Sequence, residues 1–445
     1  MASDLLSIAK SGTNAARVAL DVTAQNIANA SSEGYVRRSV RLEEVSAAGG
    51  IGRIGDVSLS GVRVDQVIRN ADLFRQTEVR RTGADLARAD AEVSGLENIE
   101  TALEQTGVFN SIVEFEGALQ QLAVDPTDPA LRASVIESTR TMTRTLNIAA
   151  TSLDAAGEGV RFEAADDIEQ VNLLSQELSR VNLRLARAAD KSSDQTSLLD
   201  QRDSLLQQLS DRVDVTASIA ADHTVEVRIG GAAGPVLVDG GTAGTMAMTT
   251  AGDGTISFTL DGNPATPLSG SLVGHGQALV KLASARTELD TIADSIVATV
   301  NAAQATGAAL DGSAGTPMLT GSGAAGIALA FEDGALIATA PAGAGANSRD
   351  GSNLATLRTA LAGNDAAGAM DALLFDVSAT VRGRTVTRDT LDAIAGNARI
   401  ALASQAGVDL DQEALNLVRF QQAFQASGRV MQVASDLFDT LLGIR

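Results

Sequence analysis

The sequence contains no cysteine, no tryptophan and a single tyrosine, Tyr35. Without cysteine the chain can form no disulfide, no thiolate nucleophile and no cysteine-ligated metal site. Aromatic residues make up only 2% of the 445 residues, so the core has to be built mainly from Ala, Leu, Val and Ile. Side chains of this size suit the close packing of helices. The missing residue types therefore favour a helical protein without thiol chemistry.

Long apolar runs and an excess of basic charge are also missing. No run reaches the length that spans a membrane, and Met1–Leu6 lacks the basic leader and apolar stretch of a secretory signal. The formal net charge is −21 at pH 7, and an acidic surface repels nucleic-acid phosphates and anionic lipid. We therefore expect neither nucleic-acid binding nor membrane insertion. If the protein leaves the cell, we expect a route that removes no N-terminal peptide.

Catalytic motifs are scarce. The only histidines, His223 and His275, are far apart in Gly-rich surroundings, and we expect both at the surface. The metalloprotease, nucleophile-elbow and P-loop patterns do not occur. Residues 321–326 match G-x-G-x-x-G, but a dinucleotide site needs a buried strand before this motif and a helix after it. Pro317 precedes it here, so we interpret it as a flexible turn. We predict no catalytic residue, no cofactor and no metal.

Two acidic clusters have a structural interpretation as well as a chemical one. Asp200 and Asp203 are three residues apart, beside Arg202, and share one face of a predicted helix. One interpretation is an acid–base pair, but we favour a solvated helix face with ion pairs across a bundle. A second group, Asp409, Asp411 and Glu413, precedes the last helix, where acidic residues stabilise a helix N-terminus.

Heptad repeats occur at both ends of the chain, in residues 5–27 and 410–442. A seven-residue apolar repeat is typical of helices that wind around another helix. The C-terminal row is Leu410, Leu417, Phe424, Met431 and Phe438, flanked by Phe420, Ser427, Ala434 and Leu441. The N-terminal rows are Leu5, Gly12, Ala19 and Asn26, and Ile8, Ala15, Val22 and Asn29. We therefore predict that the two terminal helices pair.

The balance of energies indicates that these ends are completed by neighbouring molecules. Five large apolar side chains contribute roughly 1.5–3 kcal/mol each when fully buried. Ordering a segment of about 35 residues costs on the order of 1–2 kcal/mol per residue in backbone entropy. Burial of the apolar row recovers only part of this entropy cost. We therefore expect loose chain ends in the monomer that become ordered in a polymer.

Between the ends, helical and β-type patterns alternate. Residues 31–70 have the pattern of a loop with short strands near residues 57–64. Helical patterns then cover residues 71–105, 109–124, 130–153, 162–189, 197–213, 276–304 and 354–406, the last broken near 382–388 and ended at Gly407. Period-two alternation predicts strands at 225–229 and 256–260. Further strands are expected at 327–331 and 335–338.

These patterns predict a mainly α fold with a β insertion. Paired N- and C-terminal helices form a coiled coil, and a helical bundle is built from both halves of the chain. The expected domains are a terminal assembly domain of residues 1–60 plus 400–445, a helical bundle of residues 61–215 plus 272–305 and 352–399, a small outer β domain of residues 216–271, and a Gly/Ala-rich irregular or β segment of residues 306–351.

The terminal motifs resemble those of a known family. Residues 26–35, Asn-Ile-Ala-Asn-Ala-Ser-Ser-Glu-Gly-Tyr, resemble the N-terminal signature of bacterial flagellar axial proteins, which form the rod, the hook and the hook-associated parts. Glu33 stands where that signature has Pro. Residues 417–427, followed by Leu441 and Leu442, resemble the C-terminal signature, with Phe424 in place of the usual Tyr. Within the family, residues 125–132 and 199–203 resemble the hook-associated members.

The resemblance implies a structural subunit, not an enzyme, that joins the flagellar hook to the filament. Such a subunit is exported by the flagellar type III apparatus without a cleaved signal peptide and is extracellular. The implied partners are further copies of this chain in a helical homo-oligomer, the hook protein, the second hook–filament junction protein, and an export chaperone at the C-terminal helix. The expected assembly interface comprises Leu5, Ile8, Ala15, Ala19, Val22, Asn26, Ile27, Asn29, Gly34, Tyr35, Leu410, Leu417, Phe420, Phe424, Met431, Phe438, Leu441 and Leu442.

Two alternatives remain open on the sequence. The chain can be another flagellar axial protein, such as the second junction protein or a hook-type protein. It can also be a secreted enzyme that acts on the cell wall. The enzyme would need an acid or a nucleophile in residues 216–351, where the sequence offers no convincing candidate.

Overall fold

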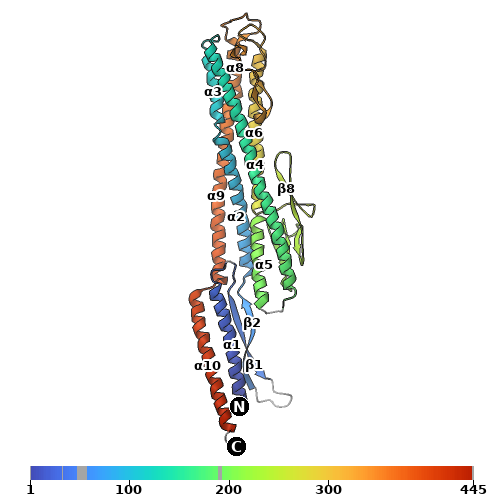
Figure 1. Cartoon of the computed structure of the whole chain (residues 1–445), viewed down its shortest axis with the longest axis vertical. Coiled ribbons are helices and arrows are strands. Elements are labelled where there is room, and N and C mark those ends of the chain that lie inside the picture. The colour runs from blue at the N-terminus through green and yellow to red at the C-terminus, as the bar shows by residue number, and fades with distance from the viewer. Residues whose placement is uncertain (1, 33, 48–57, 189–192, 443–445) are drawn as a thin grey trace. The chain divides into compact units, whose positions relative to one another are not determined.

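The computed structural model describes residues 2–32, 34–47, 58–188 and 193–442, which group into two compact units (Figure 1). The first unit contains residues 1–84, 171–245 and 392–445, and the second contains residues 85–170 and 246–391. Three long helices contribute residues to both units: α2 (Leu73–Glu104), α4 (Pro129–Leu185) and α9 (Ala366–Ala406).

The first unit brings the two ends of the chain together. Helix α1 (Ala2–Ala28) lies beside α10 (Leu410–Leu442), and the two run in opposite directions (Figure 1). This confirms the predicted pair of terminal helices. An antiparallel hairpin of β1 (Arg38–Ala47) and β2 (Ser58–Arg69) also packs on α1. The unit is completed by α5 (Ser193–Arg212) and by a four-stranded sheet of β3 (Thr216–Ile219), β4 (Val225–Arg228), β5 (Val236–Asp239) and β6 (Thr242–Ala243).

The second unit contains a helical core of the predicted composition. Its buried side chains are mostly Leu, Ile, Val and Ala, with Phe115 as its one fully buried aromatic residue among those described. The elements that complete this unit are α3 (Val108–Leu122), α6 (Ser271–Ala305), α8 (Ser352–Asn364) and a three-stranded sheet of β7 (Met246–Thr250), β8 (Ile256–Leu260) and β9 (Asn263–Ala265).

The units divide the chain at other places than the composition does. Residues 216–271 form two sheets in different units, not one small β domain. The ends of the chain group with α5 and the start of α2, because ion pairs and hydrogen bonds hold those helices to the hairpin. Residues in ion pairs of this kind come from distant parts of the sequence, so a change in composition does not mark such a boundary.

Two predicted helix breaks do not occur. Helix α4 continues through residues 154–161, and α9 continues through residues 382–388. In α4, Gly157 lies against Leu282 of α6: a Cβ there would be 3.3 Å from a Leu282 methyl carbon. The glycine therefore allows two helices to approach closely, and their packing offsets its low helix propensity. In α9, Arg384 forms an ion pair with the buried Glu92 of α2.

Residues 306–351 contain shorter strands than expected. Four strands of two residues each occur there: β10 (Gly307–Ala308), β11 (Leu319–Thr320), β12 (Ala328–Leu329) and β13 (Ala340–Pro341). The strand predicted at residues 335–338 is wrong, because a 3₁₀ turn, η1 (Gly334–Leu336), occupies this position. Its carbonyl groups are bonded to the side chain of Arg132 instead of to another strand.

The motif at residues 125–132 forms this Arg132 contact. Asp128 accepts hydrogen bonds from the backbone N–H groups of Ala130 and Leu131 and so caps α4, which begins at Pro129. Arg132 is 1% exposed. Its guanidinium donates to the carbonyls of Pro126, Gly334, Ala335 and Ile337 and to the Thr339 hydroxyl. A single buried cation thus fastens the irregular segment to the start of α4.

Glu116 of α3, also in the second unit, provides a test of how burial affects a carboxylate. Burial and the nearby Asp365 raise the pKa of Glu116. A raised folded-state pKa stabilises the fold below the ordinary value, and this contribution is lost as the pH rises through the folded value. We expect Glu116→Gln to raise the melting temperature at pH 7 and to leave it unchanged near pH 4. Glu114 is an exposed neighbour on the same helix, and Glu114→Gln should not change the melting temperature at either pH.

Candidate assembly interface

The seam between α1 and α10 is made of small residues on α1. Ala9, Ala15, Ala16 and Ala19 are all buried. On α10 the facing positions include Leu417, Phe420 and Met431, which are half-buried, and Ala434, which is buried. Small side chains on one helix let the axis of the other approach closely. The predicted terminal helices therefore do pack together, and they do so within one chain.

The closest approach along this seam is between Gly12 and Ser427. A Cβ added at Gly12 would lie 2.8 Å from the Ser427 hydroxyl oxygen and 3.6 Å from the Ser427 Cβ. Ser427 is the one polar member of its predicted row, and Gly12 is the residue without a side chain in the row opposite. The two irregular positions of the heptads thus face each other.

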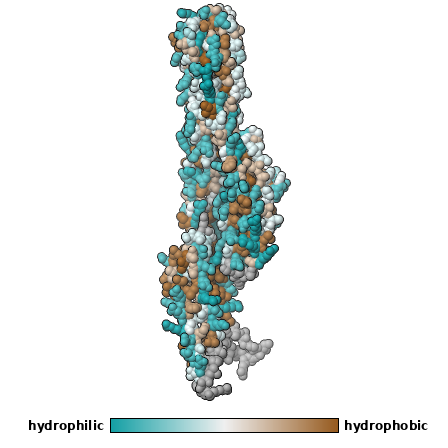
Figure 2. Space-filling model, in the orientation of Figure 1, coloured by the Kyte–Doolittle hydropathy of each residue, from teal (hydrophilic) through white to brown (hydrophobic). Residues whose placement is uncertain are grey.

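The opposite face of α10 is apolar and exposed. We define the outer stripe as Leu415, Val418, Val430, Val433 and Leu437. These side chains are 42–73% exposed, and at 100° per residue they share one side of the helix, away from the seam. Hydrophobic side chains are visible on the surface of α10 in Figure 2. A helix that is apolar on two sides and covered on only one has a free contact surface.

The other face of α1 rests on the hairpin. The hydroxyl of Ser11 accepts a hydrogen bond from the backbone N–H of Val62 in β2. Gly61 of β2 has a φ of +102°, and a Cβ there would lie 3.2 Å from the Ile8 Cα and closer still to Ser11. Only glycine fits so near a crossing helix in that conformation. Helix α1 therefore packs on α10 with one face and on the hairpin with another.

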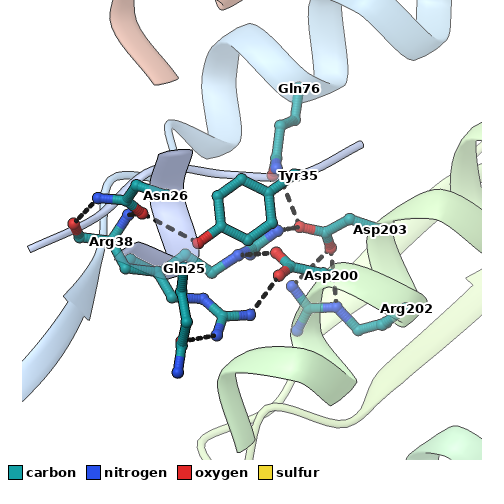
Figure 3. Close-up of polar contacts among 9 residues, drawn as sticks. Gln25, Asn26, Tyr35, Arg38, Gln76, Asp200, Arg202 and Asp203 are labelled. Carbon is teal, nitrogen blue, oxygen red and sulfur yellow. Dashed lines mark hydrogen bonds and ion pairs between the residues drawn. The ribbon is translucent and has the colours of Figure 1, made fainter. Parts of the chain in front are cut away.

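Asn26 joins the end of α1 to the first residue of β1 (Figure 3). Its side-chain amide donates to the backbone carbonyl of Arg38 at 2.8 Å and accepts from the backbone N–H of Arg38 at 3.0 Å. The Tyr35 hydroxyl donates to the same Asn26 oxygen at 2.9 Å. The Arg38 guanidinium lies 5.2 Å from the centre of the Tyr35 ring, a cation–π distance. These contacts give Asn26 and Tyr35 a specific structural role.

A network of ion pairs links the hairpin to α5 (Figure 3). Asp200 accepts from Arg38 at 2.8 Å and from Arg69 at 2.7 Å. Asp203 accepts from Arg69, Arg202 and the Gln76 amide at 2.7–2.9 Å. Burial raises the pKa of Asp203, but Arg69 and Arg202 lower it more, so it lies below its ordinary value. Both acids are largely buried, so the solvated helix face predicted for them is wrong, although ion pairs do form.

Glu413 also differs from its expected role. Asp409 caps α10 by accepting from the backbone N–H groups of Asp411 and Gln412. Glu413 instead has a side chain that is 2% exposed and accepts a 2.7 Å bond from the Arg37 guanidinium. Arg37 in turn donates its backbone N–H to the carbonyl of Ala406, at the end of α9. The sequence gives no signal for this pair, because 376 residues separate its members.

The predicted interface residues fall into three groups. Four are buried within the chain: Ala15, Ala19, Val22 and Asn26. Six are half-buried, namely Ile27, Asn29, Tyr35, Leu417, Phe420 and Met431, whereas Leu5, Ile8, Gly34, Leu410 and Phe424 are exposed. The side chains of Phe438, Leu441 and Leu442 lie outside the described residues. The outer stripe was missed, because the heptad rows describe only the seam.

The residues considered for chemistry have structural partners. His275 is buried, not at the surface as expected, and its ring nitrogens lie 3.4 Å from Asp167 and 3.7 Å from Glu163; His223 is exposed. In the G-x-G-x-x-G segment, the backbone N–H groups of Gly323 and Ala324 donate to Asp294 and Asp290. Those carboxylates occupy the donors that a phosphate would need and repel its charge.

Neither a metal centre nor a membrane span is found in the part of the chain that the structure describes. No three acidic or histidine side chains there are grouped so that they could hold a metal ion. None of the described helices is both long enough and apolar enough to cross a bilayer. A cleft of about 750 Å³ beside the ion-pair network is lined by polar and apolar residues, including Asn29, Val181 of α4, and Gln201 and Ser204 of α5.

Three protein-family models match the chain. "Flagellar hook-associated protein FlgK helical domain" matches residues 93–319, just over half of the sequence. "Flagella basal body rod protein" matches residues 6–35, and "Flagellar basal body rod FlgEFG protein C-terminal" matches residues 402–444. The two short matches fall on the terminal helices, and the long one falls mainly on the helices of the second unit.

Curated relatives carry the same description. "Flagellar hook-associated protein 1" of Bacillus subtilis (strain 168) is 24% identical, over 98% of this chain and 97% of that protein. Its namesake from Salmonella typhimurium is 28% identical over 55% of this chain, and that match covers 44% of the Salmonella protein. The solved structure of the flagellar hook junction protein FlgK from Burkholderia pseudomallei has a TM-score of 0.64 at 13% identity, over 74% of this chain and 99% of that one. That likeness shows a shared fold.

Proposed function

Because the chain belongs to the FlgK family of flagellar hook-associated proteins, we propose that it is a structural subunit of the flagellum that joins the hook to the filament. The observation that carries this proposal is the outer stripe of α10, which a single chain leaves exposed. Apolar side chains in a row on a helix are normally buried against a partner. In a polymer of this protein that partner is the next copy.

The contacts between copies are head-to-tail. A contact between two different surfaces leaves one of each free on every added copy, so it continues around a helical lattice. The seam between α1 and α10 holds the two ends of one chain together, and the outer stripe faces a neighbour. Leu5, Leu6 and Ile8 of α1 are also exposed and extend this contact surface. The proposed assembly domain is therefore centred on residues 1–60 and 400–445.

The copies at the two ends of this helical lattice each present a surface that no further copy covers, and the two surfaces bind different partners. The proposed partners are the hook protein on one side and the second hook–filament junction protein on the other. Before export, a chaperone covers the apolar side of α10 in the cytoplasm. The chain then passes through the type III apparatus and acts outside the cell. The absence of cysteine and the net charge of −21 suit a chain that travels unfolded.

The proposed role requires no catalysis. The charged residues considered for an acid–base site, Asp200, Asp203 and Arg202, bind one another and the hairpin. Their ion pairs hold the fold of the first unit and leave no free acid–base pair among these three residues. The protein works through its shape and its contacts, as a rigid piece between two others.

Deletion of the gene in the bacterium that encodes it tests the proposed function. We expect hooks of normal length without filaments, with flagellin lost to the medium, and full recovery when the gene is restored on a plasmid. Electron microscopy of the hooks and immunoblots of the culture medium measure both effects. Normal filaments on deletion cells would contradict the proposed function. Turnover of cell wall by the purified protein would contradict the absence of catalysis.

A further inference from the structure

The packing between α1 and α10 involves mostly small side chains on α1. By itself it specifies the axial position of α10 along α1 only weakly. The buried side of α1 is small over most of its length, with alanines at positions 9, 15, 16 and 19 and no side chain at Gly12, and larger buried residues, Val22 and Thr23, come only toward its end. Large side chains that fit into distinct holes fix the register of paired helices, whereas a ridge of small residues offers few such holes. A shift of α10 by one helical turn would again place apolar side chains on this ridge.

The connection to α9 does not prevent such a shift. Helix α9 ends at Ala406 and α10 begins at Leu410, so three residues join them. One helical turn is about 5.4 Å of axial movement, and unwinding a few residues at either helix end supplies that length. The position of α10 therefore needs another determinant.

We propose that the buried ion pair between Glu413 and Arg37 is that determinant and sets the register of α10 on α1. Glu413 lies at a seam position of α10, seven residues before Phe420, and its side chain is 2% exposed. Its carboxylate is 2.7 Å from Arg37. A shift of one turn would leave this carboxylate buried without its partner, which is strongly unfavourable.

Arg37 is itself held in place by the backbone. Its N–H donates to the carbonyl of Ala406, and its carbonyl accepts from the N–H of Asn70, both at 2.9 Å. The next residue, Arg38, is bonded to Asn26 at the end of α1. The cation is thus fixed to α1 and to the hairpin, and the carboxylate belongs to α10. A single polar contact at a seam position is a known means of fixing helix register.

The pair also fixes the direction of the outer stripe. Leu415 and Val418 follow Glu413 on the same helix. Fixing the Glu413 carboxylate therefore sets the axial position of these two residues and the direction in which they point from α10. For this consequence the inference rests on the proposed function. The register within one chain does not depend on it and can be measured on the purified protein.

The absence of cysteine makes the register directly measurable. In the full chain, Gly12→Cys/Ser427→Cys reports the native register, because the two Cβ positions are 3.6 Å apart, within the range of a disulfide. Gly12→Cys/Phe424→Cys and Gly12→Cys/Met431→Cys report shifts of about one turn in either direction. The rate of disulfide formation in each purified reporter is measured by mass spectrometry. We expect the native reporter to be the fastest in the otherwise unchanged chain.

Each reporter is then combined with Glu413→Leu, which removes the charge and keeps an apolar seam. The ratio of native to shifted disulfide should fall by about tenfold, as expected when a buried charge pair no longer discriminates. The exchanged pair Arg37→Glu/Glu413→Arg should restore much of the ratio. An unchanged ratio in Glu413→Leu, or equal slowing of all three reporters, would overturn the inference, because the pair would then affect only stability or nothing. Normal filaments on deletion cells would contradict the proposed function. They would not change the disulfide ratio, which is measured on the purified protein.

Discussion

Cells that produce the variant Leu415→Asp/Val433→Asp should build hooks without stable filaments, while the purified variant should melt at the wild-type temperature. The two side chains are 73% and 57% exposed, so the folded monomer loses little when they change. In the proposed array both become buried against a neighbouring copy. A carboxylate buried there without a partner costs several kcal/mol, repeated at every contact. Swimming assays, electron microscopy and calorimetry measure these effects.

A matched control lies on the same helix. Gln421→Asp/Gln432→Asp adds the same charge at exposed positions that are about 100° or more around the helix from Leu415. We expect this variant to swim normally. Normal swimming of the stripe variant would show that the outer stripe is not a contact surface. Failure of both variants would show that added charge on α10, and not the position of that charge, prevents assembly.

Arg132→Met should lower the stability of the second unit by about 3 kcal/mol or more, since the lost donors leave several buried acceptors unpaired. The Arg132 guanidinium is the donor in five hydrogen bonds, four to backbone carbonyls and one to Thr339. Methionine fills the space but donates nothing. A loss of this size corresponds to roughly 6–12 °C in the melting temperature of a unit this large, measurable by calorimetry.

Two further variants separate the hydrogen bonds from the charge. Arg132→Lys keeps the charge but lacks the planar fork that reaches several carbonyls at once, so it should recover only part of the lost stability. Arg144→Met removes an exposed arginine from the same helix and should change the melting temperature little. If Arg132→Met melts like the wild type, the irregular segment is not held by this side chain.

The sequence predicted the pairing of the chain ends because a heptad repeat is a local signal. Each row can be read from one segment, and the structure confirms that α1 and α10 pack together. The repeat does not reveal which apolar face of α10 remains free. Leu415, Val418 and Val433 belong to no heptad row, and only the structure shows that they lie opposite the seam and are exposed.

The helix breaks were mispredicted because tertiary contacts overrode local propensity. The glycines in residues 154–161 predict a break, but Gly157 packs against Leu282 from a distant segment. The opposite error occurred at residues 364–366, where no break was expected. Asp365 adopts a φ of +49° between α8 and α9, a conformation tolerated by Asp better than by most residues.

The ion-pair network was beyond the reach of the sequence for a different reason. Its members come from residues 26–38, 69–76 and 200–203, and no pattern within any one segment indicates that these segments meet. Tyr35 was singled out by resemblance alone, and Asn26 by resemblance and by its place in a heptad row. The structure gives the physical reason for them. The Asn26 amide bonds to the backbone of Arg38 as a neighbouring strand would, and the Tyr35 hydroxyl holds that amide in place.

The lowered pKa of Asp203 makes one buried contact of the first unit resistant to acid. Because Arg69 and Arg202 hold this carboxylate below its ordinary value of 3.8, its stabilising charge is fully present above that pH and disappears only as the pH falls through the lower folded value. The ion pair between Asp203 of α5 and Arg69 of the hairpin therefore persists at a pH where free aspartate is already half protonated. Loss of this contact in acid therefore begins at a lower pH than protonation of an ordinary surface aspartate.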